Sequence, residues 1–205
     1  MRFATGLVAE RSECEDSDSS FRLSGVAEVP AASSREQASR RYGARAGAFL
    51  KLYPAVTDDQ ARASAATYFG DVNFGLQMRT WARVQRRTGK SAAYLYWFDR
   101  VPPDAQCRCA THGAEIVYAF HNIALSSRPF QDADRKVSDI MSSYWVNFAT
   151  TGDPNGKELP KWPVYNEQSD ILLALGDRIE TQPVPRKAAL DFLEAYFSKP
   201  ESPRN

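Results

Sequence analysis

The chain has 205 residues, of which 43% are hydrophobic and 12% aromatic, and its 26 basic and 25 acidic residues give a formal net charge of +1. Such a composition excludes wholesale disorder, and the length predicts a core of ordinary size, in one domain or in two small ones. A net charge this close to neutral does not favour nucleic acid or an anionic membrane as a partner. No apolar run approaches the roughly 18 to 20 residues that a helix needs to span a bilayer.

We expect no export signal in the opening of the chain as written. Its apolar run meets Glu10 and Arg11 before the apolar centre of a signal peptide could develop. We therefore expect the chain as written to be cytoplasmic. Three cysteines are an odd count, so they predict no disulfide framework.

A zinc site is one interpretation of the cysteines and histidines near the middle of the chain, which are Cys107, Cys109, His112 and His121. The Cys-x-Cys spacing lies outside the usual gap of zinc ligands, and nothing else in the sequence repeats it. We therefore expect reduced loop thiols, with no metal and no cofactor.

The first thirty residues predict one strand and one loop. Phe3 to Ala9 is a short apolar run that ends in charge, which is typical of a buried strand. Residues 12–20 are polar and acidic without an apolar period, which predicts a surface loop. Their carboxylates are oxygen ligands of the kind that calcium binds, but the spacing of an EF-hand is absent.

Helices are predicted from Ser33 onward. Ser33 or Ser34 caps the first, with Glu36 at capping-box distance from Ser33, and Pro54 closes it. Thr57 caps an alanine-rich second helix.

A third helix is predicted to open at Asp71 and to stop at Gly89. An aromatic and methionine stripe recurs at helical spacing and is expected to face the core: Phe74, Met78, Trp81 and Val84. A row of arginines is expected to face solvent, in preference to a polyanion site: Arg79, Arg83, Arg86 and Arg87.

A strand followed by a histidine-bearing loop is the most informative part of the chain. Ala92 to Phe98 is apolar on both faces, as in an interior strand of a parallel sheet, and prolines end it. The loop then delivers His112, whose unperturbed pKa suits proton transfer near neutrality. Open α/β sheets carry their chemistry at this edge, so the sequence predicts an α/β fold with an imidazole at the sheet rim.

The last seventy residues predict two helices and a strand. An amphipathic helix runs from Asp134 to Ala149, and residues 152–156 form a tight turn. Ile171 to Leu175 is a short strand, and apolar residues from Ala188 to Phe197 build the final helix. Residues 199–205 are a polar tail.

Several motifs resemble one known family in residue type and in order. Two of them surround the histidine and the last long helix: His112-Gly113-x-Glu115-Ile116-x-Tyr118-x-Phe120, and Tyr144-Trp145-x-Asn147-Phe148-Ala149-x-Thr151-Gly152-Asp153-Pro154-Asn155-Gly156. Both resemble segments of the type-B carboxylesterases, the cholinesterase-like branch of the α/β-hydrolase fold. The resemblance implies that residues 1–198 are the carboxyl-terminal part of such a domain, a partial α/β-hydrolase with the last strands of the central sheet and their flanking helices.

The family's chemistry is ester hydrolysis by a serine, a histidine and an acid. The resemblance places His112 at the position of the general base and makes Glu115 a buried, hydrogen-bonded carboxylate that supports it. The acid follows the first strand in the family, and Arg11 occupies that position here if the alignment has no gap. An arginine cannot accept the imidazole N–H, so the neighbouring Glu10 is the candidate acid, with Glu13 and Glu15 further along.

The parts of this mechanism that lie earlier in the family's chain order are missing from this sequence. It contains no Gly-x-Ser-x-Gly elbow for the nucleophile and no His-Gly-Gly-Gly oxyanion loop. We expect no appreciable esterase activity from this chain alone, and binding of a carboxylic ester when it is joined to the missing part. The resemblance also makes the apolar stripe of the third helix a candidate wall of the acyl or alcohol pocket, and its parent family is often secreted or periplasmic.

Two further expectations concern self-association and an alternative class of function. An exposed edge and an uncovered apolar face favour self-association. Arg11 at the acid position also favours an alternative class of function, a non-catalytic, esterase-like binding or interaction module. Retention of His112 with its flanking residues favours the hydrolase.

Overall fold

The structure is a computed structural model that describes residues 3–8, 30–101, 103, 110 and 112–198. The chain divides into two compact units, which are described separately. Residues 1–14 and 77–185 form the sheet unit, and residues 15–76 and 186–205 form the helical unit. Within the described residues, none of the helices combines the length and the apolar character that crossing a bilayer requires.

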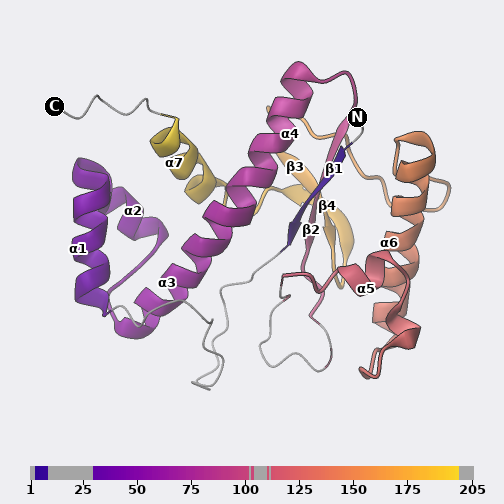
Figure 1. The fold of residues 1–205 in the computed structure, drawn as a ribbon, viewed down its shortest axis with the longest axis horizontal. Helices are drawn as coiled ribbons and strands as arrows, with labels where there is room; N and C mark the ends of the chain where they lie inside the picture. Colours follow the sequence, from indigo (N-terminus) through magenta and orange to yellow (C-terminus); the bar gives the residue numbers. More distant parts are fainter. Residues whose placement is uncertain (1–2, 9–29, 102, 104–109, 111, 199–205) are drawn as a thin grey trace. The chain divides into compact units, whose positions relative to one another are not determined.

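The sheet unit contains a four-stranded mixed sheet (Figure 1). Its strands lie in chain order: β1 (Phe3–Val8), β2 (Ala93–Phe98), β3 (Ile171–Leu175) and β4 (Ile179–Pro183). The first three are parallel and β4 is antiparallel to β3. The α/β class and the first three strands are therefore confirmed. β4 was not predicted, because Glu180 and Thr181 interrupt its apolar pattern and both are exposed.

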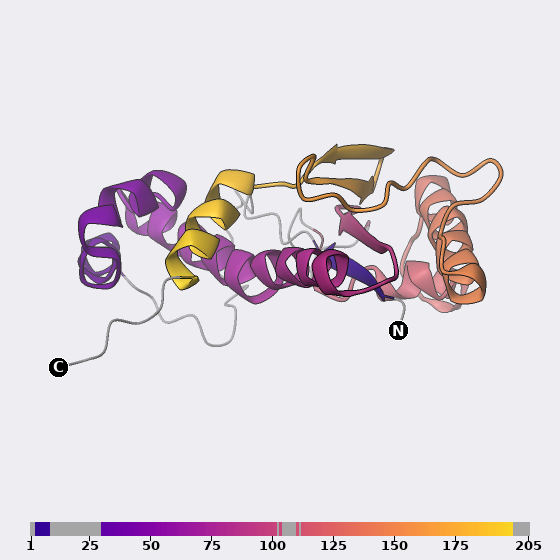
Figure 2. The ribbon, with the colours of Figure 1, turned by 90° about the horizontal axis from the view of Figure 1, so that it is seen from above.

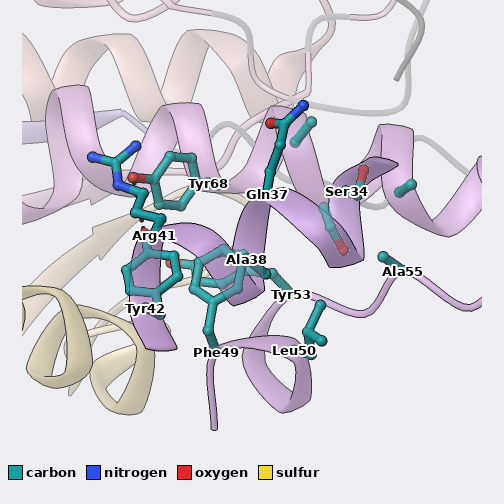
Figure 3. A pocket seen from close by; sticks show the side chains of 13 residues that line it. Ser34, Gln37, Ala38, Arg41, Tyr42, Phe49, Leu50, Tyr53, Ala55 and Tyr68 are labelled. Carbon is teal, nitrogen blue, oxygen red and sulfur yellow. Dashed lines mark hydrogen bonds between the residues drawn. The ribbon is translucent and has the colours of Figure 1, made fainter. Parts of the chain in front are cut away.

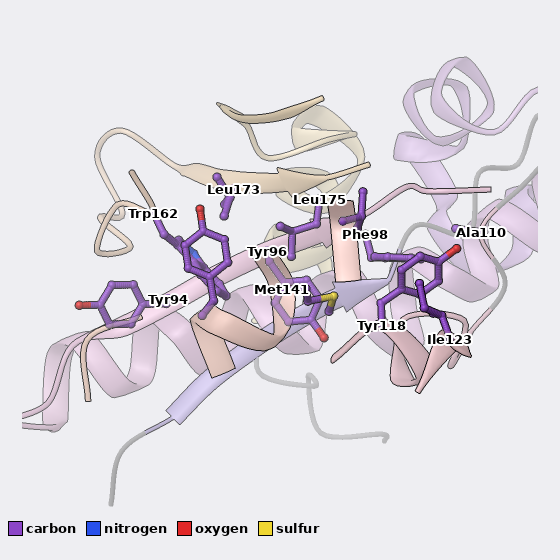
Figure 4. Packing of buried hydrophobic residues seen from close by; sticks show 12 residues of the cluster. Tyr94, Tyr96, Phe98, Ala110, Tyr118, Ile123, Met141, Trp162, Leu173 and Leu175 are labelled. Atoms are coloured by element: carbon purple, nitrogen blue, oxygen red, sulfur yellow. The ribbon is translucent and has the colours of Figure 1, made fainter. Parts of the chain in front are cut away.

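The core of the sheet unit lies between the sheet and a pair of helices. These are the short α5 (Ile116–Ala119) and the long α6 (Asp132–Thr151), with a 3-10 turn at Ile123–Leu125 between them. Figure 4 shows how the aromatic side chains of β2 meet those of the helices. Trp162 lies among them, with its ring centroid 5.9 Å from that of Tyr96 and 5.2 Å from that of Tyr144.

Strand β2 is buried on both faces, as predicted for an interior strand. Tyr94, Tyr96 and Phe98 enter the core cluster that contains α5 and α6, and the alternating residues Ala93 and Leu95 are buried as well. The predicted amphipathic helix is also confirmed, since Val137, Met141 and Tyr144 of α6 are buried in this cluster.

Within its described residues, the helical unit contains three helices before the long α4 and a last helix after β4. They are α1 (Ala31–Tyr42), α2 (Ala46–Leu52), α3 (Asp58–Gly70) and α7 (Lys187–Phe197), with a 3-10 turn at Gly43–Arg45. Thr57 caps α3 as predicted, accepting the Gln60 N–H at 3.2 Å. The predicted final helix is confirmed by α7, seen in yellow in Figure 2.

The predicted start of the first helix is wrong. Helix α1 begins at Ala31, and neither Ser33 nor Ser34 caps it. The Ala31 N–H instead donates to the Asp58 carboxylate at 2.8 Å, a cap supplied from another helix that local spacing cannot reveal. The helix also does not run on to Pro54, because Gly43 takes φ +53° and breaks it.

The predicted opening of the third helix at Asp71 is also wrong. Asp71 lies in a π-helical turn, Asp71–Gly75, that joins α3 to α4 (Leu76–Thr88). Its carboxylate is buried and accepts hydrogen bonds from the Tyr53 hydroxyl at 2.7 Å and from Arg186 Nε at 2.8 Å. A buried acid of this kind anchors the turn instead of capping a helix.

The face that α4 buries differs from the one predicted. Trp81 is 60% exposed and Val84 is 50% exposed, whereas Arg79 is 1% exposed. Arg79 Nε donates to Asp170 Oδ1 at 3.2 Å, and a second nitrogen of the guanidinium also contacts this carboxylate. The arginine prediction is therefore wrong at Arg79 and at Arg83, whose side chain is 11% exposed. The acid that makes the burial of Arg79 tolerable lies 91 residues away in the sequence.

Candidate active site

The candidate site begins where two neighbouring strands end. Strands β1 and β2 are parallel, and their last residues, Val8 and Phe98, are partners in the register. The carboxyl ends of these strands therefore meet at one edge of the sheet. From this edge the chain continues from β2 toward the turn that carries His112.

His112 lies in a turn, at residues 112–115, and its side chain is exposed. Gly113 takes φ +82°, a left-handed conformation that glycine adopts without strain, and its carbonyl accepts the Ile116 N–H at 3.1 Å. Ala110, two residues before the histidine, is 1% exposed within the core. The imidazole is thus presented to solvent between a buried anchor and the start of α5, and is not enclosed by the core.

A buried network fixes helix α5 behind this turn. The Tyr118 hydroxyl donates to Asp134 Oδ1 at 2.8 Å, and Arg100 Nε donates to the same oxygen at 2.6 Å. Ser138 Oγ donates to the Tyr118 carbonyl at 3.1 Å, which ties α5 to α6 again. These contacts hold the segment after His112 against the core.

The charge state of this network follows from its contacts. Burial acts to raise the pKa of Asp134, but the hydrogen bond from Arg100 and those from Gln131 and Tyr118 outweigh it, so the net pKa of this carboxyl lies below its ordinary value. Burial, with the neighbouring Asp134, raises the pKa of the Tyr118 phenol. At neutral pH the network therefore holds an ionised Asp134 and a protonated Tyr118.

Glu115 precedes α5 and faces the core. Its Oε2 is buried and has no hydrogen-bond partner among the residues that the structure describes. Burial raises the pKa of the Tyr96 phenol, and the nearby charge of Glu115 raises it further. The predicted supporting role of Glu115 stays a prediction.

Other predicted site residues lie elsewhere. Glu10, Arg11, Cys107 and Cys109 are outside the described residues, as are residues 12–20 of the acidic loop. His121 is exposed, and its Nε2 lies 2.7 Å from Asp139 Oδ1. Among the described side chains, no group of three or more histidines, cysteines and acids is arranged to hold a metal ion.

Sequence reasoning missed the residues that position this turn. Asp134 was read as the start of a helix, but it lies in the first turn of α6, where its Oδ2 accepts the Gln131 N–H at 2.8 Å. The three-residue spacing from Gln131 to Asp134 was a usable signal for this contact. The contact between Asp134 and Arg100 spans 34 residues and left no local pattern.

Comparisons with known proteins agree with the motifs around the histidine. A family model described as the carboxylesterase family matches residues 10–193. Human carboxylesterase 3 is 35% identical over 154 residues, which cover 69% of this chain and 25% of that protein. Fumonisin B1 esterase of Sphingopyxis macrogoltabida is 32% identical over 148 residues, covering 67% of this chain and 27% of that protein.

Mouse carboxylesterase 1C is 32% identical over 135 residues, which cover 61% of this chain and 24% of that protein. The chain thus spans about a quarter of the length of these curated relatives. Because the family model matches most of the chain, including the turn with His112 and all of α6, the chain belongs to the carboxylesterase family.

Proposed function

We propose that this chain is the carboxyl-terminal portion of a serine carboxylesterase with an α/β-hydrolase fold, and that His112 is the general base of its triad. The observation that carries the proposal is the exposed imidazole on a turn that follows a strand of a parallel sheet, inside the segment that matches the family. Residues 1–198 contribute the last strands of the sheet and their helices, and residues 199–205 are a tail.

In this proposal His112 acts on a serine from the missing portion. The imidazole takes the serine proton as the hydroxyl attacks the ester carbonyl, and it returns that proton to the leaving alcohol. A carboxylate must then orient the imidazole by accepting its other N–H. Glu10 follows β1, the strand next to β2, and we assign it this role, while Glu115 supports the turn from the core side.

The substrate class is a carboxylic ester, and this chain alone cannot complete the reaction. Neither a Gly-x-Ser-x-Gly elbow nor a His-Gly-Gly-Gly loop occurs in its 205 residues. A histidine without an activated serine and without oxyanion donors lacks the two parts that carry most of the rate enhancement.

Hydrolysis of a short-chain nitrophenyl ester tests this proposal. The chain is assayed alone and as a fusion in which it is joined to an amino-terminal carboxylesterase segment that contains Gly-x-Ser-x-Gly. We expect no hydrolysis above the level of free imidazole from the chain alone, and turnover from the joined protein. Full activity of the chain alone would contradict the proposal.

The alternative, a non-catalytic esterase-like interaction module, is favoured by Arg11 at the position expected for the acid. The joined protein separates the two proposals. An Arg11→Asp variant that gains activity by orders of magnitude over an inactive parent would support the module, since it would show that the natural residue blocks the triad. A parent that already turns over the ester, and loses turnover in Glu10→Gln, would support the hydrolase.

A further inference from the structure

A cavity of about 150 Å³ lies inside the helical unit. Its walls come from α1, α2, α3 and the loop between the last two. Most of the lining is apolar or aromatic and includes Ala38, Phe49, Leu50, Ala61 and Ala65. An apolar cavity of about 150 Å³ holds roughly one benzene-sized group, so this one has room for a single ring or a short alkyl chain.

The charged group of the cavity lies on one side of it (Figure 3). The Arg41 guanidinium lies beside the Tyr68 hydroxyl, while Phe49 and Leu50 lie on the other side. The guanidinium carbon is 5.8 Å from the centroids of the Tyr42 and Tyr68 rings, so aromatic faces hold this cation at the cavity. The side of the cavity that carries charge is therefore positive.

The cation at this cavity has no acidic partner within the part of the chain that the structure describes. Its neighbour on the same helix, Arg40, pairs with Glu36 at 2.5 Å, whereas the described ion pairs include none for Arg41. An unpaired guanidinium next to a hydroxyl is a fork of donors that matches a carboxylate.

The two phenols add a donor for the same ligand. Tyr42 donates its hydrogen to the Tyr68 oxygen at 3.1 Å, which leaves the Tyr68 hydrogen for another acceptor. Burial raises the pKa of Tyr42, so at neutral pH this phenol carries no negative charge that would repel an anion.

We propose that this cavity binds a small monocarboxylate with an aromatic ring or a short alkyl chain. The carboxylate contacts Arg41 and the Tyr68 hydroxyl, and the apolar part fills the space beside Ala38, Leu50 and Ala65. The site is independent of the proposed esterase chemistry, because none of its residues belongs to the turn of His112.

Calorimetric titration of the full chain with benzoate, and with benzyl alcohol as a neutral ligand of similar size, tests the site. We expect saturable 1:1 binding of benzoate, at least about tenfold tighter than binding of benzyl alcohol, because a charge-assisted hydrogen bond contributes about that factor. The benzoate affinity falls as salt is added, since Arg41 is exposed.

Three variants locate the binding. Arg41→Gln is expected to weaken benzoate binding about tenfold, whereas Arg40→Gln, on the same helix, leaves it unchanged. Ala65→Leu fills the cavity and is expected to abolish binding of both ligands. Circular dichroism checks that each variant is folded. If Arg41→Gln does not fold, the ratio of the affinities of the natural chain for benzoate and benzyl alcohol tests whether the site recognises a carboxylate.

Three results would overturn the proposal. If benzoate showed no saturable binding at millimolar concentration, the cavity would not be a binding site for it. If benzyl alcohol bound as tightly as benzoate, or if the Arg41→Gln variant bound benzoate like the natural chain, the site would not recognise a carboxylate through Arg41.

Discussion

Arg79 is a buried charged side chain, and its role in the fold is to form an ion pair with Asp170. It is 1% exposed and pairs with Asp170, which also accepts the Tyr165 hydroxyl at 2.7 Å. Burial acts to raise the pKa of Asp170, but the hydrogen bonds from Arg79 and Tyr165 outweigh it and leave that pKa below its ordinary value. The pair ties α4 to the start of β3.

Removing one partner of this pair should destabilise the sheet unit strongly. We expect Arg79→Leu to cost about 3 to 5 kcal/mol, because it leaves the Asp170 carboxylate buried without its cation. Arg87→Leu, on the same helix, removes an exposed pair with Glu167 and should cost less than about 1 kcal/mol. Urea unfolding of both variants measures the difference, and equal losses would refute the structural role of Arg79.

Asp134 predicts a specific dependence of stability on pH. Its folded-state pKa is lowered, so its contribution is present above the unfolded value of about 3.9 and is lost as pH falls through the folded value. Asp134→Asn should therefore reduce the free energy of unfolding at pH 7, and the gap from the natural chain should narrow below about pH 4. Denaturant titrations across this range test the sign, and a gap that widens toward acid would contradict it.

At the scale of elements, the N-cap of α3 offers a clean test of local sequence signals. Thr57 was predicted as a cap, and its side chain accepts the Gln60 N–H. We expect Thr57→Ala to destabilise the helical unit by about 1 kcal/mol, because it leaves an N–H of the first turn without its acceptor. Thr80→Ala, at an exposed position inside α4, serves as the control and should change the stability little.

Helix α4 shows where periodicity fails. The sequence of this helix has an apolar stripe at helical spacing, but that spacing alone does not determine which face of the helix packs against the core. The buried face is instead set by Asp170 and by Ala82, which is 0% exposed. In α6 the same kind of stripe was correctly assigned, since Val137, Met141 and Tyr144 all enter the buried core cluster of the sheet unit.

At the scale of the whole molecule, the positions of three strands and the order of the family motifs were accessible from sequence, and long-range polar contacts were not. Apolar runs located β1, β2 and β3, and family motifs located His112 on an exposed turn. The cap from Asp58 to Ala31 and the contact from Arg100 to Asp134 join residues 27 and 34 positions apart. Such contacts depend on the finished fold, and no local pattern encodes them.

The edge of the sheet at β1 predicts self-association. Its residues, Phe3 to Val8, include neither a charge nor a proline, whereas the other edge strand, β4, carries Glu180 and Pro183. We expect size-exclusion chromatography to show oligomers that Thr5→Lys disperses, while Thr181→Lys on β4 leaves them unchanged. A compact monomer of the natural chain would contradict this expectation.

The most direct test of the central claim compares the two histidines of the chain. In the protein joined to a segment with Gly-x-Ser-x-Gly, nitrophenyl ester hydrolysis is measured for His112→Ala and for His121→Ala, which alters an exposed histidine beside Asp139. If His112 is the general base, His112→Ala loses kcat by several orders of magnitude and His121→Ala keeps it. Equal rates for the two variants would remove His112 from the mechanism.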